Sequence, residues 1–380
     1  MFESNSISSQ KDKKVEYLEL VYDLIFVYII GRNNSLLHHT ENGFISWGMF
    51  LAYAFCTLAI IQIWTFSTIY INLYGRNGTR DHVFLFINMF LLYHMADGIS
   101  TQWESSMARF NVAWALILFN IGVQYLIERR NHLDYPLEVK QIDHKAIILL
   151  IEGMLVIGQM FAYSLWGVSL AYIPILFGMM SVGISNRINN RIPVDFDHLT
   201  ERIMLYVVFT FGEMIISIAS YFEGDITSGS LYFSTMAFLI VVGLLISYGT
   251  FYNRILDKEK TTGGTLYMLI HILMIFALNN ISVSLEFMRE ETILLLPKIL
   301  FLTGSFVIFF LCLFSLGKYA KQKCNMNKTF YITIAVLAVS FIALMIALKD
   351  HMRINIAVTV IYAFTVFALL KKTSKEIEQE

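Results

Sequence analysis

The stretch AIILLIEGMLVIGQMFAYSLWGVSLAYIPILFGMMSVGIS, residues 146–185, decides the fold class. A transmembrane helix needs about 20 consecutive apolar residues, so this stretch is long enough for two helices. We expect a tight turn between them near residues 164–168. Glu152 is the only charged residue in the stretch, and it falls in the first of the two helices. A run of this kind is typical of an integral membrane protein.

The composition of the whole chain agrees with that class. Hydrophobic residues make up 57% of the 380 residues, charged residues 15%, and the mean hydropathy is +0.61. A soluble domain carries about 25% charged residues, because water must wet its surface. Lipid is therefore the expected solvent for most of this chain. No basic patch interleaves with aromatic residues, so nucleic-acid binding is not expected.

Apolar runs of sufficient length predict an all-α transmembrane bundle of about 12 spans. The runs start near Leu20, Ile45, Val83, Phe110, Ala146, Val168, Ile203, Leu231, Leu266, Lys298, Phe330 and Ile354. The predicted organisation is a cytoplasmic segment 1–17, a six-helix half 18–186, a cytoplasmic connector 187–202, a second six-helix half 203–370 and a tail 371–380.

The distribution of lysine and arginine predicts the orientation. With the N-terminus in the cytoplasm, most of the 28 lysines and arginines fall in inner segments, Lys145 among them. The outer segments hold only Arg109, Arg289, Lys298, Lys349 and Arg353. Cytoplasmic loops carry an excess of these residues, so both termini are expected in the cytoplasm.

The helix starts repeat at a nearly constant spacing along the two halves. His271 follows Asn88 by the same number of residues as Asn280 follows Asp97. This spacing predicts a 6+6 internal repeat with both halves in one orientation, related by an axis along the membrane normal.

The first predicted helix carries charges that lipid does not tolerate. Glu19 and Asp23 are four residues apart and therefore share one helix face. An ionisable side chain at the bilayer centre costs at least about 2.5–3.5 kcal/mol, so it usually faces the bundle interior and has a partner. Arg32 lies nine residues beyond Asp23, on the opposite face. Another helix must supply the partner of Asp23.

The seventh predicted helix is the expected source of partners. Its Arg202 is expected to pair with Glu19 or Asp23 near the cytoplasmic side. Glu213 falls at almost the same depth as Arg32, which predicts a second pair near the midplane.

Three further interpretations concern the same helix and the second one. Thr200 and Glu201 are typical of a helix start. Gly212 predicts a close approach by a neighbouring helix. The end of the second helix carries a group of aromatic and polar residues that we interpret as an interfacial aromatic belt: Trp64, Tyr70, Asn72 and Tyr74.

Asn88, Asp97, Glu152 and His271 are secondary candidates for an ion or substrate pathway. A single histidine or asparagine in a membrane helix more often makes an interhelical hydrogen bond than binds a ligand. The adjacent pair His38-His39 splays apart on a helix, so no metal or other cofactor is expected. The sequence holds no catalytic fingerprint in a context that supports it, and an enzyme is not expected.

Three segments resemble the bacterial low-temperature-requirement A (LtrA) family. VEYLELVYDLIFVY, residues 15–28, is similar to the opening motif of the family. The run from Gln62 to Gly75 is similar to the end of the family's second helix. A later helix of the family is similar to Thr200-Glu201-Arg202 followed by Phe211-Gly212-Glu213. The resemblance implies a multi-pass protein of the bacterial cytoplasmic membrane. It marks Glu19, Asp23, Glu201, Arg202 and Glu213 as pattern residues but implies no reaction.

The leading functional hypothesis is a secondary transporter or ion-coupled carrier. Asp23 and Glu213 would exchange protons, while Arg32 and Arg202 would hold an anionic substrate or a carboxylate. The expected partners are the lipid bilayer and an unidentified small molecule or ion. Two alternatives stay open: a sensor or assembly factor with architectural charges, and a lipid-modifying membrane enzyme. The substrate, the coupling direction, the oligomeric state and any link to growth at low temperature stay open as well.

Overall fold

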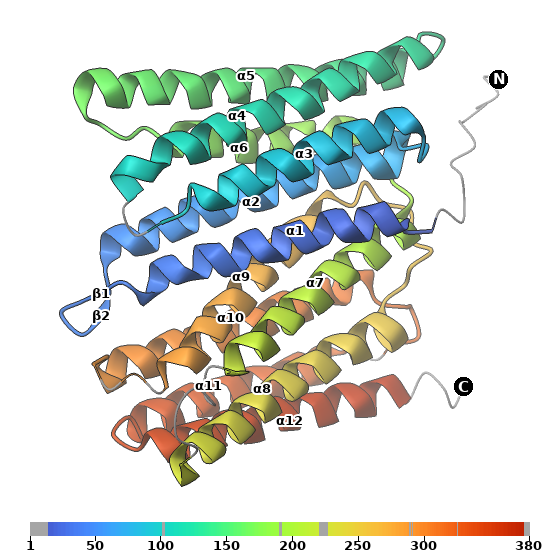
Figure 1. The fold of residues 1–380 in the computed structure, drawn as a ribbon. Helices are drawn as coiled ribbons and strands as arrows, with labels where there is room; N and C mark the ends of the chain where they lie inside the picture. The colour runs from blue at the N-terminus through green and yellow to red at the C-terminus, as the bar shows by residue number, and fades with distance from the viewer. Residues whose placement is uncertain are drawn as a thin grey trace. The chain divides into compact units, whose positions relative to one another are not determined.

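A computed structural model describes residues 14–100, 103–189, 192–219, 227–288, 290, 292–324 and 326–375. This part of the chain forms twelve α-helices and one short β-hairpin (Figure 1). The prediction of an all-α bundle is confirmed at this level. Eight of the helices are long and apolar enough to cross a membrane. The twelve spans, the internal repeat and the cytoplasmic termini stay predictions.

The helices follow the predicted apolar runs. They are α1 (Tyr17–Asn34), α2 (Trp47–Tyr74), α3 (Thr79–Asp97), α4 (Trp103–Glu128), α5 (Pro136–Trp166), α6 (Tyr172–Asn189), α7 (Phe196–Ile218), α8 (Ser228–Thr250), α9 (Thr265–Phe287), α10 (Leu295–Ser315), α11 (Lys328–Ala347) and α12 (Met352–Lys375). The tight turn expected after α5 is present. Gly167 ends that helix in the left-handed region, with φ 67°.

A hairpin between α1 and α2 was not predicted. Its strands are β1 (Thr40–Glu41) and β2 (Phe44–Ile45), which pair antiparallel. Asn42 and Gly43 form the turn with φ 51° and 81°. A type I′ hairpin turn needs positive φ at both central positions, and asparagine followed by glycine supplies it at low cost.

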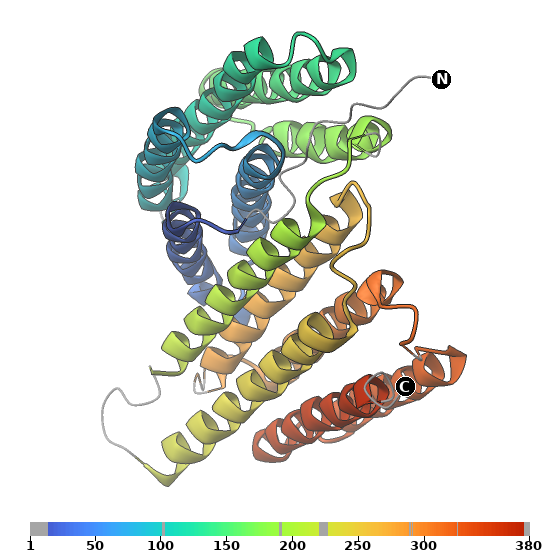
Figure 2. The same ribbon diagram turned by 90° about the vertical axis from the view of Figure 1, so that its right-hand side faces the viewer.

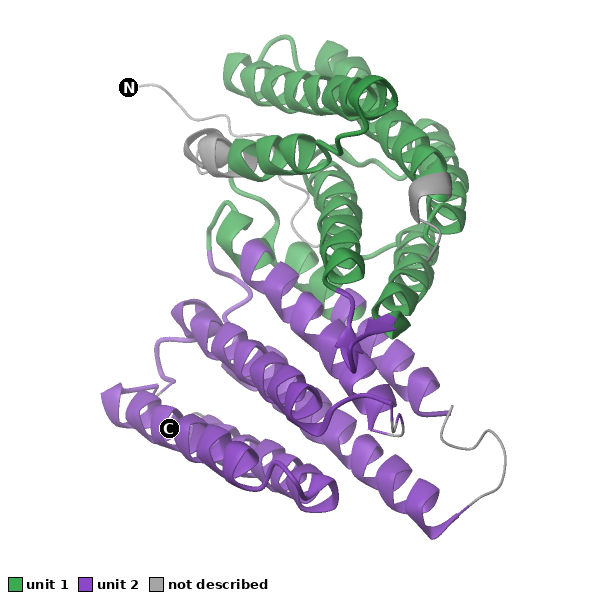
Figure 3. Ribbon diagram, turned by 90° about the vertical axis from the view of Figure 1, so that its left-hand side faces the viewer, with its two compact units in different colours: residues 1–39, 47–205, 261–268 green, residues 40–46, 206–260, 269–380 purple. Residues whose placement is uncertain are grey.

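The chain divides into two compact units (Figure 3). Unit 1 comprises residues 1–39, 47–205 and 261–268, and unit 2 comprises residues 40–46, 206–260 and 269–380. Within unit 1, α4 packs against α3 and α5, and α2 lies between α1 and α6 (Figure 2). Within unit 2, α8 packs against α12, and α11 contacts α10 and α12.

Helix α5 buries polar side chains and exposes large apolar ones, unlike a helix in a soluble protein. Its buried face carries five polar side chains among apolar ones: Glu138, Gln141, Lys145, Glu152 and Gln159. Its exposed face is apolar, with Met154 and Leu165 exposed by 62% and 72%. This arrangement suits a helix whose outer face meets lipid and whose inner face lines a polar interior. Lys145, expected in an inner loop, is a buried residue of this helix.

Glycine permits close packing on α6. A Cβ atom at Gly178 would lie 1.4 Å from Gln62 Nε2 and 2.7 Å from Glu152 Oε2. The close approach expected at Gly212 is wrong, because a Cβ atom there would meet no described atom within 4 Å. At Gly178, the side chains of Gln62 and Glu152, rather than a helix backbone, leave no room for a methyl group.

Candidate functional site

A buried ionic cluster joins α1 to the second turn of α7 within unit 1. Arg202 donates from Nε and Nη2 to the two carboxylate oxygens of Asp23, at 3.3 and 3.1 Å. Its remaining nitrogen, Nη1, lies 3.2 Å from Glu19 Oε2. The side chains of Asp23 and Arg202 have no exposed surface. The pairing expected between Arg202 and an acid of the first helix is confirmed, and it includes both acids.

Helix α2 supplies a further donor to Asp23. Trp64 Nε1 donates to Asp23 Oδ1 at 2.8 Å, and the guanidinium of Arg202 lies 6.0 Å from the centroid of the tryptophan ring. The hydrogen bonds that Asp23 accepts from Arg202 and Trp64 all come from N–H donors. An ionised carboxylate, which only accepts hydrogen bonds, matches these surroundings.

Contacts at the start of α7 fix which ring nitrogen of His198 carries the proton. Asn72 bonds the backbone of Asp195 in both directions: its Oδ1 accepts from the N–H at 3.0 Å and its Nδ2 donates to the carbonyl at 2.8 Å. The orientation of the Asn72 amide is thereby set, and its second N–H faces His198 Nδ1 at 3.1 Å. His198 Nδ1 is therefore the acceptor, and the ring carries its proton on Nε2, 3.5 Å from Glu19 Oε2.

The charges of the four described members of this cluster do not balance without a further proton. Arginine is always protonated, and the contact with Asn72 keeps His198 neutral. If Glu19 and Asp23 were both ionised, the buried cluster would carry a net negative charge. An uncompensated buried charge costs several kcal/mol. Because N–H donors face both oxygens of Asp23, the geometry favours Glu19 as the group that holds the balancing proton.

Two sequence interpretations of these helices are wrong. The helix start expected at Thr200 and Glu201 lies one turn too late, because α7 begins at Phe196 and Asp195 Oδ1 accepts from the N–H of His198 at 3.1 Å. The residues interpreted as an aromatic belt are buried: Trp64, Tyr70, Asn72 and Tyr74. Contact with α1, α4, α5 and α7 outweighs the interfacial preference of aromatic residues there.

A second polar group lies between α2 and α5. Gln62 Nε2 donates to Glu152 Oε2 at 3.0 Å, and Glu152 is fully buried. Lys145 and Gln159 lie on the same face of α5, about two turns before and two turns after Glu152. Both are buried, and neither makes a side-chain hydrogen bond to a described residue. Lys145 Nζ lies 5.8 Å from the centroid of the Phe66 ring. Buried polar groups of this kind are usually satisfied by water or a ligand.

A third network ties helix ends together around Glu128, which is fully buried. Glu128 contacts Arg76 at 3.2 Å and Arg80 at 2.5 Å. His132 places Nε2 3.0 Å from Glu128 and Nδ1 2.5 Å from Glu138. Because both ring nitrogens face carboxylates, an imidazolium matches the contacts. This network joins the ends of α2 and α4 to the starts of α3 and α5.

The remaining predicted residues lie outside these groups. Arg32 is exposed and Glu201 half-buried in unit 1, and Glu213 is half-buried in unit 2, where Glu286 acts on it electrostatically. The predicted Arg32–Glu213 pair joins residues of different units and stays a prediction.

The secondary candidates have ordinary partners. Asn88 accepts from Asn120 at 2.9 Å, and His271 lies 3.3 Å from the Tyr248 hydroxyl. Asp97 forms an exposed ion pair with Arg109. Among the described residues, no three histidine, cysteine, aspartate or glutamate side chains form a group that could hold a metal ion.

Long apolar helices and buried charged clusters define an integral membrane protein with a polar interior. Residues 14–366 match the family described as bacterial low temperature requirement A protein (LtrA). The chain belongs to this family, as the resemblance of its helices indicated. No curated protein and no solved structure matches the chain.

Proposed function

We propose that the protein is a secondary transporter or ion-coupled carrier in which Glu19 is the proton-binding group. The observation that carries this proposal is the charge balance of the Glu19–Asp23–His198–Arg202 cluster. The contacts assign a protonation state to Asp23, His198 and Arg202, and the balancing proton is then assigned to Glu19. The proposal therefore places the exchangeable proton on Glu19 rather than on Asp23, which the sequence suggested.

Burial of Glu19 is what would couple its proton to the movement of a second solute. Loss of the Glu19 proton would leave one negative charge in a site closed to water, at a cost of several kcal/mol. Release would therefore require that water or a cation reach the site. A conformational change that opens the site and releases the proton would link proton movement to the movement of a second solute.

Helix α2 connects the proton site to the second polar group. Trp64 contacts Asp23, and Gln62, two residues earlier on α2, contacts Glu152 on α5. The polar stripe of α5 provides groups that a polar solute or ordered water could bind. We propose that this interior is where the coupled solute passes.

An architectural role is the second candidate function. The saturated Asp23–Trp64–Arg202 contacts favour it, because a fully bonded buried pair can fix helix packing without moving a proton. A sensor or assembly factor would then need no flux through unit 1.

Proton flux in proteoliposomes tests the proposal. The protein is reconstituted with an internal pH dye, and valinomycin sets the membrane potential. We expect flux in the wild type and loss of flux in Glu19→Gln, which mimics the protonated carboxyl and should fold. Asp97→Asn is the matched control, because it neutralises an exposed acid of the same unit.

The outcomes separate the two candidates. Flux that is unchanged in Glu19→Gln would overturn the assignment of the proton to Glu19. No flux in any folded protein under any imposed gradient would favour the architectural role. Glu213→Gln in the same assay tests the acid of unit 2, and loss of flux there would extend the pathway to that unit.

A further inference from the structure

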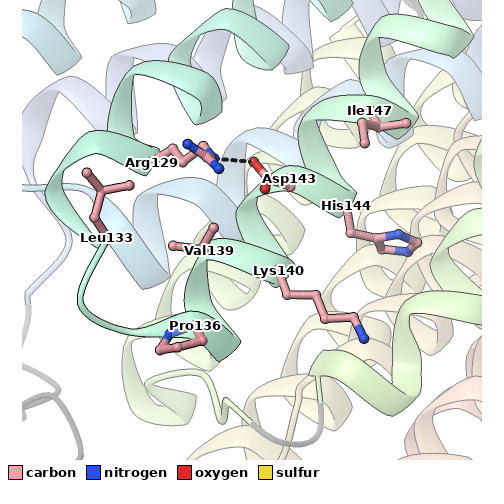
Figure 4. Close-up of a pocket in the computed structure, with 8 residues that line it drawn as sticks. All are labelled: Arg129, Leu133, Pro136, Val139, Lys140, Asp143, His144 and Ile147. Carbon is pink, nitrogen blue, oxygen red and sulfur yellow. Dashed lines mark hydrogen bonds and ion pairs between the residues drawn. The ribbon is translucent and has the colours of Figure 1, made fainter.

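An open pocket of about 550 Å³ lies where α4 connects to α5 (Figure 4). Eight residues line it: Arg129, Leu133, Pro136, Val139, Lys140, Asp143, His144 and Ile147. Arg129 and Asp143 point toward each other, and their ion pair measures 2.7 Å. Lys140 and His144 extend from consecutive turns of α5. The pocket thus combines basic side chains with an apolar lining.

The exposed face of α5 fixes the depth of this pocket in a bilayer. An apolar exposed stripe continues from the pocket along the helix: Ile147, Ile151, Met154, Phe161 and Leu165. Its length from first to last residue is about 27 Å, at about 1.5 Å per residue. This length is close to the roughly 30 Å thickness of the hydrocarbon core. Lys140 and His144 lie just beyond the stripe, and a stripe that fills the hydrocarbon core would place them at the level of the lipid headgroups.

The charges of the pocket favour an anion. Arg129 and Asp143 compensate each other, whereas Lys140 has no acidic partner among the lining residues. One phosphodiester charge would balance Lys140 and could also accept hydrogen bonds from Arg129. Basic pockets beside apolar helix faces suit anionic headgroups, because the acyl chains and the phosphate are both satisfied.

We propose that this pocket binds the phosphate headgroup of an anionic phospholipid, whose acyl chains lie along the exposed stripe of α5. The headgroup contacts Lys140 and Arg129, and Leu133 and Ile147 contact the first carbons of the chains. Asp143 holds Arg129 in place and disfavours a second anion. The site is separate from the Glu19 cluster and does not depend on the transport proposal.

Lipid retention by the full chain tests the site. Native mass spectrometry compares phosphatidylglycerol with phosphatidylcholine of the same acyl chains, bound to the detergent-purified protein. We expect preferential retention of phosphatidylglycerol. Lys140→Gln should weaken it about fivefold, and the double variant Lys140→Gln/Arg129→Gln should weaken it further. Lys328→Gln, at another exposed helix start, is the matched control and should behave as wild type.

Each outcome bears on the assignment. Retention of phosphatidylglycerol that is equal in wild type and Lys140→Gln would overturn the site. An equal loss in Lys328→Gln would also overturn it, because any surface lysine would then serve. Displacement of the lipid by millimolar inorganic phosphate, with no dependence on the acyl chains, would assign the pocket to free phosphate instead. Thermal denaturation of each variant verifies that the fold is intact.

Discussion

Two of the aspartate–arginine pairs in unit 1 have the same chemistry and opposite surroundings. Asp23 and Arg202 have no exposed side-chain surface, whereas Asp97 and Arg109 are 55% and 64% exposed. Water screens an exposed pair, which typically contributes about 0–1 kcal/mol. Removal of one partner from a buried pair costs about 3–5 kcal/mol, because the other charge stays buried. Burial, rather than pairing, therefore decides which charges constrain this protein.

The largest effect is expected for Arg202→Met. The substitution keeps a long side chain but leaves the buried acids Asp23 and Glu19 without their cation, so the stability should fall by about 3–5 kcal/mol. Thermal denaturation in detergent measures the loss. Addition of Asp23→Asn to Arg202→Met should restore part of the stability, since the uncompensated charge is removed. A single variant as stable as wild type would break the comparison.

An intermediate effect is expected for Gly178→Ala. The new methyl group would lie where Gln62 now reaches Glu152, so the hydrogen bond between them must break or α6 must shift. Overpacking of this kind costs about 1–3 kcal/mol. Gly158→Ala is the control, because a Cβ atom at Gly158 meets nothing within 4 Å. Equal melting temperatures of the two alanine variants would contradict the close packing of Gln62 against Gly178 of α6.

The smallest effect is expected for Arg109→Met, the counterpart of the Arg202 substitution. Asp97 stays in contact with water when its partner is removed, so the stability should change by about 1 kcal/mol or less. The same denaturation assay compares the two methionine variants side by side. A loss at Arg109 as large as that at Arg202 would show that burial does not separate the pairs.

Sequence patterns predicted the helices because a long apolar run in lipid must satisfy its backbone hydrogen bonds within the segment, as a helix does. The partner of Asp23 could also be predicted, since a buried acid in the first helix requires a basic residue at a similar depth. His198 carried a usable signal that was missed: it lies four residues before Arg202, on the same helix face. The Asn42-Gly43 dipeptide likewise indicated the hairpin.

Other features depend on which helices are neighbours, and a single sequence does not specify this. Tryptophan is common at membrane interfaces, and only the contact with α1 shows that Trp64 donates to Asp23. Gly178 and Gly212 look alike in sequence, yet only Gly178 faces a side-chain pair that excludes a methyl group. The charged residues around Lys145 suggested a loop, but α5 already begins at Pro136 and buries Lys145.

The protonation state of Glu19 tests the central claim most directly. Infrared difference spectroscopy across a pH jump detects the C=O stretch of a protonated carboxyl group in the purified protein. The account predicts a band that is absent in Glu19→Gln and retained in Asp97→Asn. A band that persists in Glu19→Gln, or no protonated carboxyl group at any pH at which the protein is folded, would contradict it.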